Sequence, residues 1–148
     1  MIYDLTLLLT AVVAGFMLTY SITLGAYFNY LLSHNMDQGF SNFYSKFRQD
    51  TWAVNLYQAC VGLQFFLGLT TLLLTSYPIT VRSLAVIPLI VLLSCHRLTG
   101  FSKSEEEVNS GKPISNETRQ NYLKWNLPLH YLYFCVYFIS ALVQLLLH

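Results

Sequence analysis

A series of polar side chains runs through the C-terminal part of the sequence, and its residue types could support acid–base chemistry. The members recur at intervals close to whole turns of an α-helix, so one helical face would carry them all. They are Arg119, Asn126, His130, Tyr137 and Gln144. His130 is the one member that titrates near neutral pH, which makes it the candidate general acid or base. Asn126 and Arg119 would stabilise the enolate or phenolate that forms when this base removes a proton.

Polar and aromatic residues elsewhere in the chain are predicted to complete a pocket around this series. Polar groups inside an apolar protein are costly unless they bond across helices or line a cavity. Tyrosine rings would bind a flat or oily ligand, and their hydroxyls would orient it. The candidate ligand-binding residues are Asn55, His96, Tyr27, Tyr133 and Tyr137.

Each of the main candidates also has a purely structural interpretation. His130 would be a hydrogen-bonded histidine of the protein interior, and Asn126 would bond to another helix. His96 would be a cation that suits the C-terminal end of a helix dipole. The sequence leaves both interpretations of each residue open.

The sequence contains none of the short motifs that mark a metal, nucleotide or redox site. The histidines lack the fixed spacing of metal-ligand motifs such as HxxxH, so no metal site is predicted. No nucleophile elbow, phosphate-binding loop or dinucleotide motif occurs, and no cofactor is predicted. The cysteines, Cys60, Cys95 and Cys135, are interpreted as packed free thiols because no CxxC pair supports redox chemistry.

The elements that position these side chains belong to a chain of apolar composition. It has 148 residues, of which 55% are hydrophobic and 10% are charged. A soluble domain carries about a quarter charged residues, so the composition indicates an integral membrane protein. The net charge of +1 provides no basic field for nucleic acid, which is not expected as a partner.

Four apolar segments are long enough to cross a bilayer as helices. They cover about residues 5–32, 51–75, 79–98 and 120–147. We therefore expect one all-α domain over residues 1–148, an antiparallel up-down four-helix bundle in the membrane. The first segment is too long for a signal peptide and lacks a basic start, so it is expected to be retained. Pro88 is expected to interrupt the third helix, and Pro113 with Ser115 to start the fourth.

The positive charges indicate which side of the membrane each loop faces. Seven lysines and arginines fall on the side of the two longer loops, residues 33–50 and 99–119, and only Arg82 falls on the side of the termini. By the positive-inside rule the long loops are cytoplasmic and both termini lie outside. The predicted location is the cell membrane, which the chain crosses several times with membrane lipid around it.

Short motifs in three parts of the sequence carry a family likeness. They are Ala14-Gly15-Phe16 in the first predicted helix, the loop that leads to Asn55, and Thr118-Arg119 followed by Trp125-Asn126 near the start of the fourth. With these motifs, and over most of its length, the chain resembles the small four-helix membrane proteins grouped with the anthrone oxygenases. Such families often carry a second polar residue three positions beyond the Trp-Asn pair, where this chain has Leu129 followed by His130.

Two functions of different classes are compatible with these features. The resemblance implies oxidation of anthrones by oxygen without an evident cofactor, so the first is an oxygenase-like oxidoreductase for a phenolic or lipid-like small molecule. His130 would remove a proton, and oxygen would react with the carbanion. The second is a non-enzymatic membrane protein: a ligand binder, a carrier or a partner subunit. Polar residues on two faces of the second predicted helix favour this alternative, including a homo-oligomer.

Overall fold

A computed structural model describes residues 1–36, 38, 44–110 and 112–147 of the chain. Within these ranges the protein is all-α, as the sequence predicts, and no residue forms a β-strand. The helices in chain order are α1 (Ile2–Ile22), α2 (Leu24–Ser33), α4 (Ser45–Asp50), α5 (Ala53–Leu74), α6 (Ile79–Ser83), α7 (Ile87–Leu98), α8 (Phe101–Asn109) and α9 (Asn116–Leu146). Ser115 is the N-cap of α9, because its hydroxyl oxygen accepts a hydrogen bond from the Thr118 backbone N–H, and this confirms the predicted helix start.

Within the described residues, three helical segments are long and apolar enough to cross a membrane. They are the α1–α2 segment (Ile2–Ser33), α5 and α9. At about 1.5 Å per residue, the 22 residues of α5 span about 33 Å, close to the thickness of a bilayer core. The remaining apolar helix, α7, has only 12 residues. The region 79–98, which the sequence predicts as a helix interrupted at Pro88, therefore forms two shorter helices.

A break divides this third apolar segment at residues 84–86. Helix α6 ends before the break, and α7 begins after it with Pro88 in its first turn. Proline fits there because the first turn of a helix needs no backbone N–H donor. The predicted interruption thus lies just before Pro88, which occupies the first turn of the second helix. The Ala85 carbonyl in the break accepts a hydrogen bond of 2.9 Å from Gln64 Nε2 in α5.

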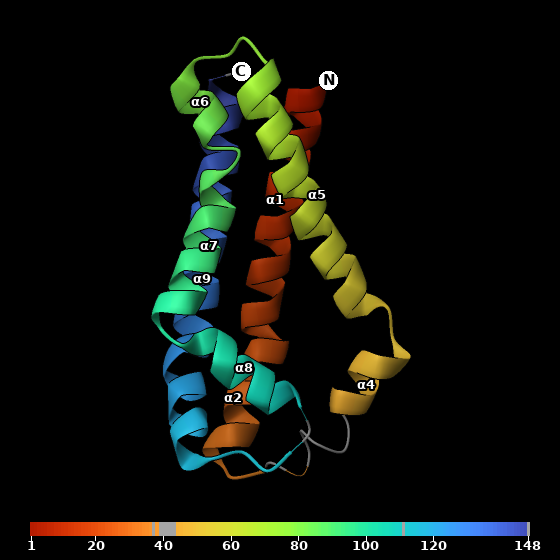
Figure 1. Cartoon of the computed structure of the whole chain (residues 1–148), viewed down its shortest axis with the longest axis vertical. Coiled ribbons are helices and arrows are strands. Elements are labelled where there is room, and N and C mark those ends of the chain that lie inside the picture. Colours follow the sequence, from red (N-terminus) through yellow and green to blue (C-terminus); the bar gives the residue numbers. More distant parts are fainter. Residues whose placement is uncertain (37, 39–43, 111, 148) are drawn as a thin grey trace.

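Helix α1 lies at the centre of the arrangement. It packs along α9 and also along α5, while α2, α7 and α8 pack against α9. The two termini and the α5–α6 connection lie at one end of the molecule (Figure 1). Helices α4 and α8 and the start of α9 lie at the opposite end, which we call the α8 end. The apolar core includes Val13, Met17, Leu32, Phe101 and Tyr122.

The corner between α5, α6 and the break is closely packed. Gly68 of α5 is buried against the Ala85 backbone, and a Cβ atom at this position would lie 2.4 Å from the Ala85 carbonyl oxygen. Only glycine permits this approach. Arg82 fixes the same corner, because its Nη1 donates to the carbonyls of Leu72 and Thr75 at the end of α5, at 2.9 and 3.0 Å.

Buried hydroxyl and amide groups join α1 to α5 on the same side of the molecule. Gln64 Nε2 also donates to Thr10 Oγ1 at 3.0 Å. The hydroxyl oxygens of Thr6 and Thr71 are 2.8 Å apart. A buried polar group without a hydrogen bond is costly, so these pairs fix how α1 and α5 lie against each other.

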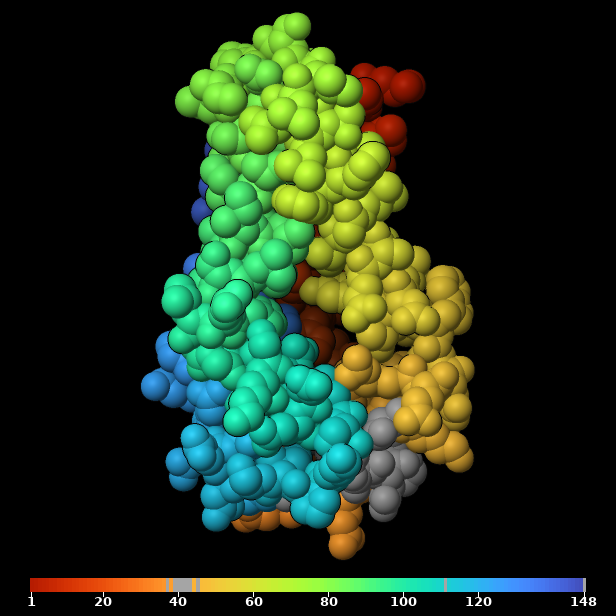
Figure 2. Space-filling view, in the orientation of Figure 1, coloured from red at the N-terminus to blue at the C-terminus, as the bar shows by residue number. Residues whose placement is uncertain are grey.

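Beyond this contact, α5 and α7 diverge towards the α8 end (Figure 1). The space-filling view shows a hollow between them, with atoms of α1 at its back (Figure 2). The partly buried apolar residues that pack against the core include Tyr57 and Val61 of α5 and Leu92 and Cys95 of α7. The divergence therefore leaves the core less covered between α5 and α7 than at the Gly68 corner.

Candidate functional site

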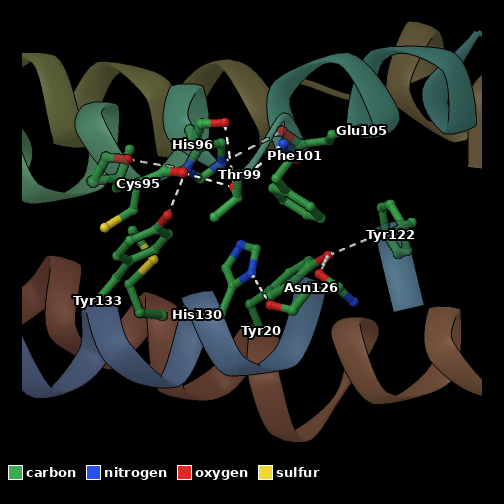
Figure 3. A network of polar contacts seen from close by, with 12 residues as sticks. Tyr20, Cys95, His96, Thr99, Phe101, Glu105, Tyr122, Asn126, His130 and Tyr133 are labelled. Carbon is green, nitrogen blue, oxygen red and sulfur yellow. Dashed lines mark hydrogen bonds and ion pairs between the residues drawn. The ribbon is translucent and has the colours of Figure 1, made fainter. Parts of the chain in front are cut away.

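Polar and aromatic side chains from α1, α7, α8 and α9 meet near the α8 end of the molecule (Figure 3). The residues on α9 are three or four positions apart, so regular helix geometry puts them on one face. The members are Tyr20 from α1, His96 from α7, Phe101 and Glu105 from α8, and Tyr122, Asn126, His130 and Tyr133 from α9. We call this group the His130 site.

His130 is the buried titratable group at the centre of the site. It is 7% exposed, and its Nδ1 lies 2.7 Å from the backbone carbonyl oxygen of Asn126. A carbonyl oxygen can only accept, so Nδ1 carries the hydrogen and Nε2 of the neutral ring keeps its lone pair. Nε2 has no hydrogen-bond partner among the described residues, and Figure 3 shows it pointing towards the α7–α8 turn. The site therefore presents a base in a fixed tautomer.

Aromatic rings surround the imidazole of His130. The Tyr20 ring is nearest, with 4.2 Å between the ring centroids. The rings of Tyr133 and Phe101 follow at 5.9 and 6.1 Å, and that of His96 lies at 6.4 Å. Ring surfaces of this kind suit contact with a flat, largely apolar ligand.

A second histidine connects the site to the surface. His96, in the last turn of α7, has its Nδ1 2.7 Å from the Tyr133 hydroxyl oxygen and 3.2 Å from the Leu92 carbonyl oxygen. Its Nε2 lies 3.7 Å from Glu105 Oε2, an ion-pair distance when the ring is protonated. The His96 side chain is 16% exposed and that of Glu105 is 39% exposed, so the carboxylate reaches water.

Helix α8 places the Glu105 carboxylate over this second histidine. Gly100 has a φ of 68°, a left-handed conformation that lets the chain turn sharply between α7 and α8. Phe101 and Val108 then bury one face of α8 in the core. Ser104 on the same face accepts a 2.7 Å hydrogen bond from an asparagine side chain of α9. The carboxylate lies at the edge of this buried face.

Sequence reasoning missed Phe101 and Glu105 as members of the site, because it treats residues 99–119 as a polar loop. A signal is present in the sequence: Phe101, Ser104 and Val108 have the spacing of one face of a short helix. The glutamates that interrupt this series suggest a solvated segment and hide the pattern.

The side chain of Asn126 holds the joint between α1 and α2. Its Oδ1 accepts a 3.0 Å hydrogen bond from the Tyr20 hydroxyl. Its Nδ2 donates to the Gly25 carbonyl at 3.2 Å and to Asn29 Oδ1 at 2.8 Å. The helix is broken at Thr23, just before these acceptors. Asn126 is fully buried, and its amide fixes this joint.

The other predicted site residues lie apart from His130. Arg119 donates from Nη1 to Asn35 Oδ1 at the end of α2, about 16 Å along α9 from His130. Asn55 is exposed on α5, and Tyr27 is 55% exposed on α2. Tyr137 is buried in the core about 10 Å further along α9. Of the predicted set, the structure thus brings together His130, Asn126, His96 and Tyr133.

Tyr44, the residue before α4, extends the aromatic packing beside α2. Its ring meets Phe28 edge-on, with 4.5 Å between the centroids. Burial raises the pKa of the Tyr44 hydroxyl, the Arg48 guanidinium opposes this shift and the Glu105 carboxylate adds to it. The phenol therefore stays protonated at neutral pH, within electrostatic reach of the α8 carboxylate.

Comparison with known proteins assigns the chain to no family. No protein-family model, curated protein or solved structure matches it. Among the residues that the structure describes, no three His, Cys, Asp or Glu side chains are grouped so that they could hold a metal ion. The described part of the chain thus defines a class by structure alone: an all-α protein with helices apolar enough to cross a membrane and a buried histidine–tyrosine site.

Proposed function

We propose that the chain is a multi-pass protein of the cell membrane, arranged as an antiparallel up-down four-helix bundle. The crossings are α1–α2, α5, the broken α6–α7 segment and α9. A break inside a membrane requires that its freed backbone groups be satisfied, and the bond from Gln64 meets this requirement for the Ala85 carbonyl. The excess of lysine and arginine in the long loops supports a cytoplasmic α8 end and external termini.

We further propose that the protein is an enzyme in which His130 removes a proton from a lipid-soluble aromatic or phenolic molecule. One observation carries this proposal: the Nε2 lone pair of a buried imidazole in a fixed tautomer faces aromatic rings, without a hydrogen-bond partner among the described residues. A histidine that only stabilises a buried core usually bonds through both ring nitrogens. A positioned general base of this kind contributes about 10²–10⁴-fold to a rate.

The substrate class follows from the walls of the site and from the route of entry. Tyr20, Phe101 and Tyr133 present ring surfaces, which suit a flat aromatic molecule. The hollow between α5 and α7 opens at the side of the molecule, so a lipid-soluble substrate enters from the bilayer (Figure 2). A charged molecule would lose its hydration on the same route, which disfavours it.

Oxidation of an activated methylene group by oxygen suits this base and agrees with the resemblance to anthrone oxygenases. His130 Nε2 takes a proton from the carbon between two aromatic rings, and the resulting enolate adds to O₂ through that carbon. The peroxide takes the proton back from the imidazolium and loses water, so the methylene group and O₂ become a carbonyl group and water. The imidazolium stabilises the enolate by its charge. Asn126 and Arg119 take no part, because their side chains bond elsewhere.

The test uses anthrone as the probe and protein reconstituted in lipid vesicles, with oxygen uptake and absorbance as readouts. Wild-type protein should oxidise anthrone faster than protein-free vesicles, and His130→Ala should reduce this gain by at least about 100-fold. His34→Ala is the matched control, because His34 is exposed and its Nδ1 bonds within its own helix end. An unchanged rate in folded His130→Ala, or no protein-dependent oxidation, would overturn the enzyme proposal.

A second candidate function, that of a non-enzymatic subunit, is supported by the outward face of α5. Asn55 and Gln58 are exposed on a helix apolar enough to cross a membrane, and a Cβ at Gly62 would meet no atom within 4 Å. Amides both donate and accept hydrogen bonds, so this face can pair with the same face of a second copy. Replacing both amides by leucine should then lower the mass in mild detergent, measured by light scattering. A monomeric wild type would rule this contact out.

A further inference from the structure

We propose that Glu105, His96 and Tyr133 form a proton path between the His130 site and the water at the α8 end. The inference rests on the proposed function, because the path serves the proton that His130 binds. It assigns a role to a half-exposed carboxylate, a partly buried imidazole and a fully buried phenol that lie in sequence from surface to core (Figure 3).

The contacts along this path run from the surface into the site. Glu105 Oε2 is 3.7 Å from His96 Nε2, which suits an ion pair or one bridging water. His96 Nδ1 is 2.7 Å from the Tyr133 hydroxyl oxygen. The Tyr133 ring in turn lies 5.9 Å from the His130 ring. A ligand hydroxyl or a single water between His130 Nε2 and the Tyr133 oxygen completes the path.

Both neutral tautomers of His96 have hydrogen-bond partners in place. With the hydrogen on Nε2, the ring donates towards Glu105 and Nδ1 accepts the Tyr133 hydroxyl hydrogen. With the hydrogen on Nδ1, the ring donates to the Leu92 carbonyl at 3.2 Å. Such a ring can relay a proton outward. The Tyr133 hydroxyl proton moves to His96 Nδ1, and the proton on His96 Nε2 moves to the carboxylate of Glu105. The Tyr133 oxygen then accepts the proton that leaves His130.

His130 needs such a connection because the residue is buried, with only 7% of its surface exposed. Its Nδ1 is held by the Asn126 carbonyl, and Nε2 points towards the α7–α8 turn. The base must be neutral when a substrate binds, so a proton that it has acquired must leave through groups able to bind and release one. The titratable groups that face His96 from the helices packed against α7 are Glu105 of α8 and Tyr133 and His130 of α9.

Nitrogen-15 NMR of histidine-labelled protein in lipid nanodiscs tests the path without a substrate. The first readout is the tautomer of His96, whose signals are assigned with His96→Gln. We expect the hydrogen on Nε2 in the wild type and in Glu105→Gln, whose side-chain oxygen still accepts. In Glu105→Leu we expect it on Nδ1, bonded to the Leu92 carbonyl. Glu106→Leu, at the exposed neighbouring position, is the matched control and should behave as the wild type.

The second readout is the rate at which His130 Nε2 gains and loses a proton, followed by the broadening of its nitrogen-15 signal as the pH is lowered. A proton path predicts that Glu105→Gln and Tyr133→Phe slow this exchange at least about tenfold, while Glu106→Leu leaves it unchanged. A purely structural role would predict the opposite, because a loosened site admits water and exchanges faster. Unchanged or faster exchange would overturn the path. So would a His96 tautomer that is the same in Glu105→Leu as in the wild type. Neither readout involves anthrone oxidation, so failure of this inference and failure of the proposed function are distinguishable.

Discussion

Replacing Gly68 by alanine should destabilise the corner between α5 and α6. The added Cβ would lie 2.4 Å from the Ala85 carbonyl oxygen, whereas ordinary contact begins at 3.4 Å, so one backbone must retreat by about 1 Å. Overpacking of this kind costs about 1–3 kcal/mol. The retreat also stretches the 2.9 Å hydrogen bond from Gln64 to Ala85, and an unsatisfied buried carbonyl costs about 1–3 kcal/mol. Because partial relaxation reduces each cost, we expect the free energy of unfolding to fall by about 2–4 kcal/mol.

Gly62→Ala on the same helix is the matched control for this change. A Cβ at Gly62 would meet no atom within 4 Å. Alanine also favours a helix over glycine by about 0.5–1 kcal/mol, so the Gly62→Ala protein should be as stable as the wild type or more stable. The assay is reversible unfolding in mixed micelles of a mild detergent and SDS, followed by far-ultraviolet circular dichroism. If Gly68→Ala and Gly62→Ala were equally stable, the close approach of α5 to the break would be refuted.

Three further predictions concern other parts of the chain. Asn126→Leu should lower the free energy of unfolding by about 2–4 kcal/mol in the same assay, because the Gly25 carbonyl and two side chains lose their partner; a negligible loss would contradict the α1–α2 joint. Ser115→Ala should cost about 1 kcal/mol and speed hydrogen exchange at the Thr118 amide, and unchanged exchange would exclude the cap. In vesicles, a membrane-impermeant maleimide should label Cys135 only after SDS is added, in a variant whose other cysteines are serine; earlier labelling would show that α9 does not cross the bilayer.

The parts of the fold that the sequence predicts are those set by neighbouring residues. Long apolar segments predict the α1–α2, α5 and α9 helices, because the length of a crossing is a local property. Ser115 is recognisable as the start of α9, because an N-cap hydroxyl and the N–H that it binds are only three residues apart. The helix period also places Asn126, His130 and Tyr133 on one side of α9, and all three are buried.

The partners of these side chains are not predictable from the sequence, because they come from distant parts of the chain. Periodicity indicates that Asn126 faces inward, but its acceptors Gly25 and Asn29 are 101 and 97 residues away. The same periodicity places Arg119 on the face of His130, although the rise of the helix separates them by about 16 Å. On a helix of 31 residues, a shared face does not establish a shared site.

The three consecutive glutamates of α8 show why composition fails to identify the carboxylate of the site. Glu106 is exposed, Glu107 accepts a hydrogen bond from the Thr118 hydroxyl, and Glu105 faces the site. Successive residues turn by about 100° around a helix, so three adjacent identical side chains point in three directions. Their environments differ because Phe101 fixes which face of α8 is buried. Glu105 lies one helical turn after Phe101 and therefore on the same side of α8. Its position follows from the docking of α8 and does not depend on the proton path.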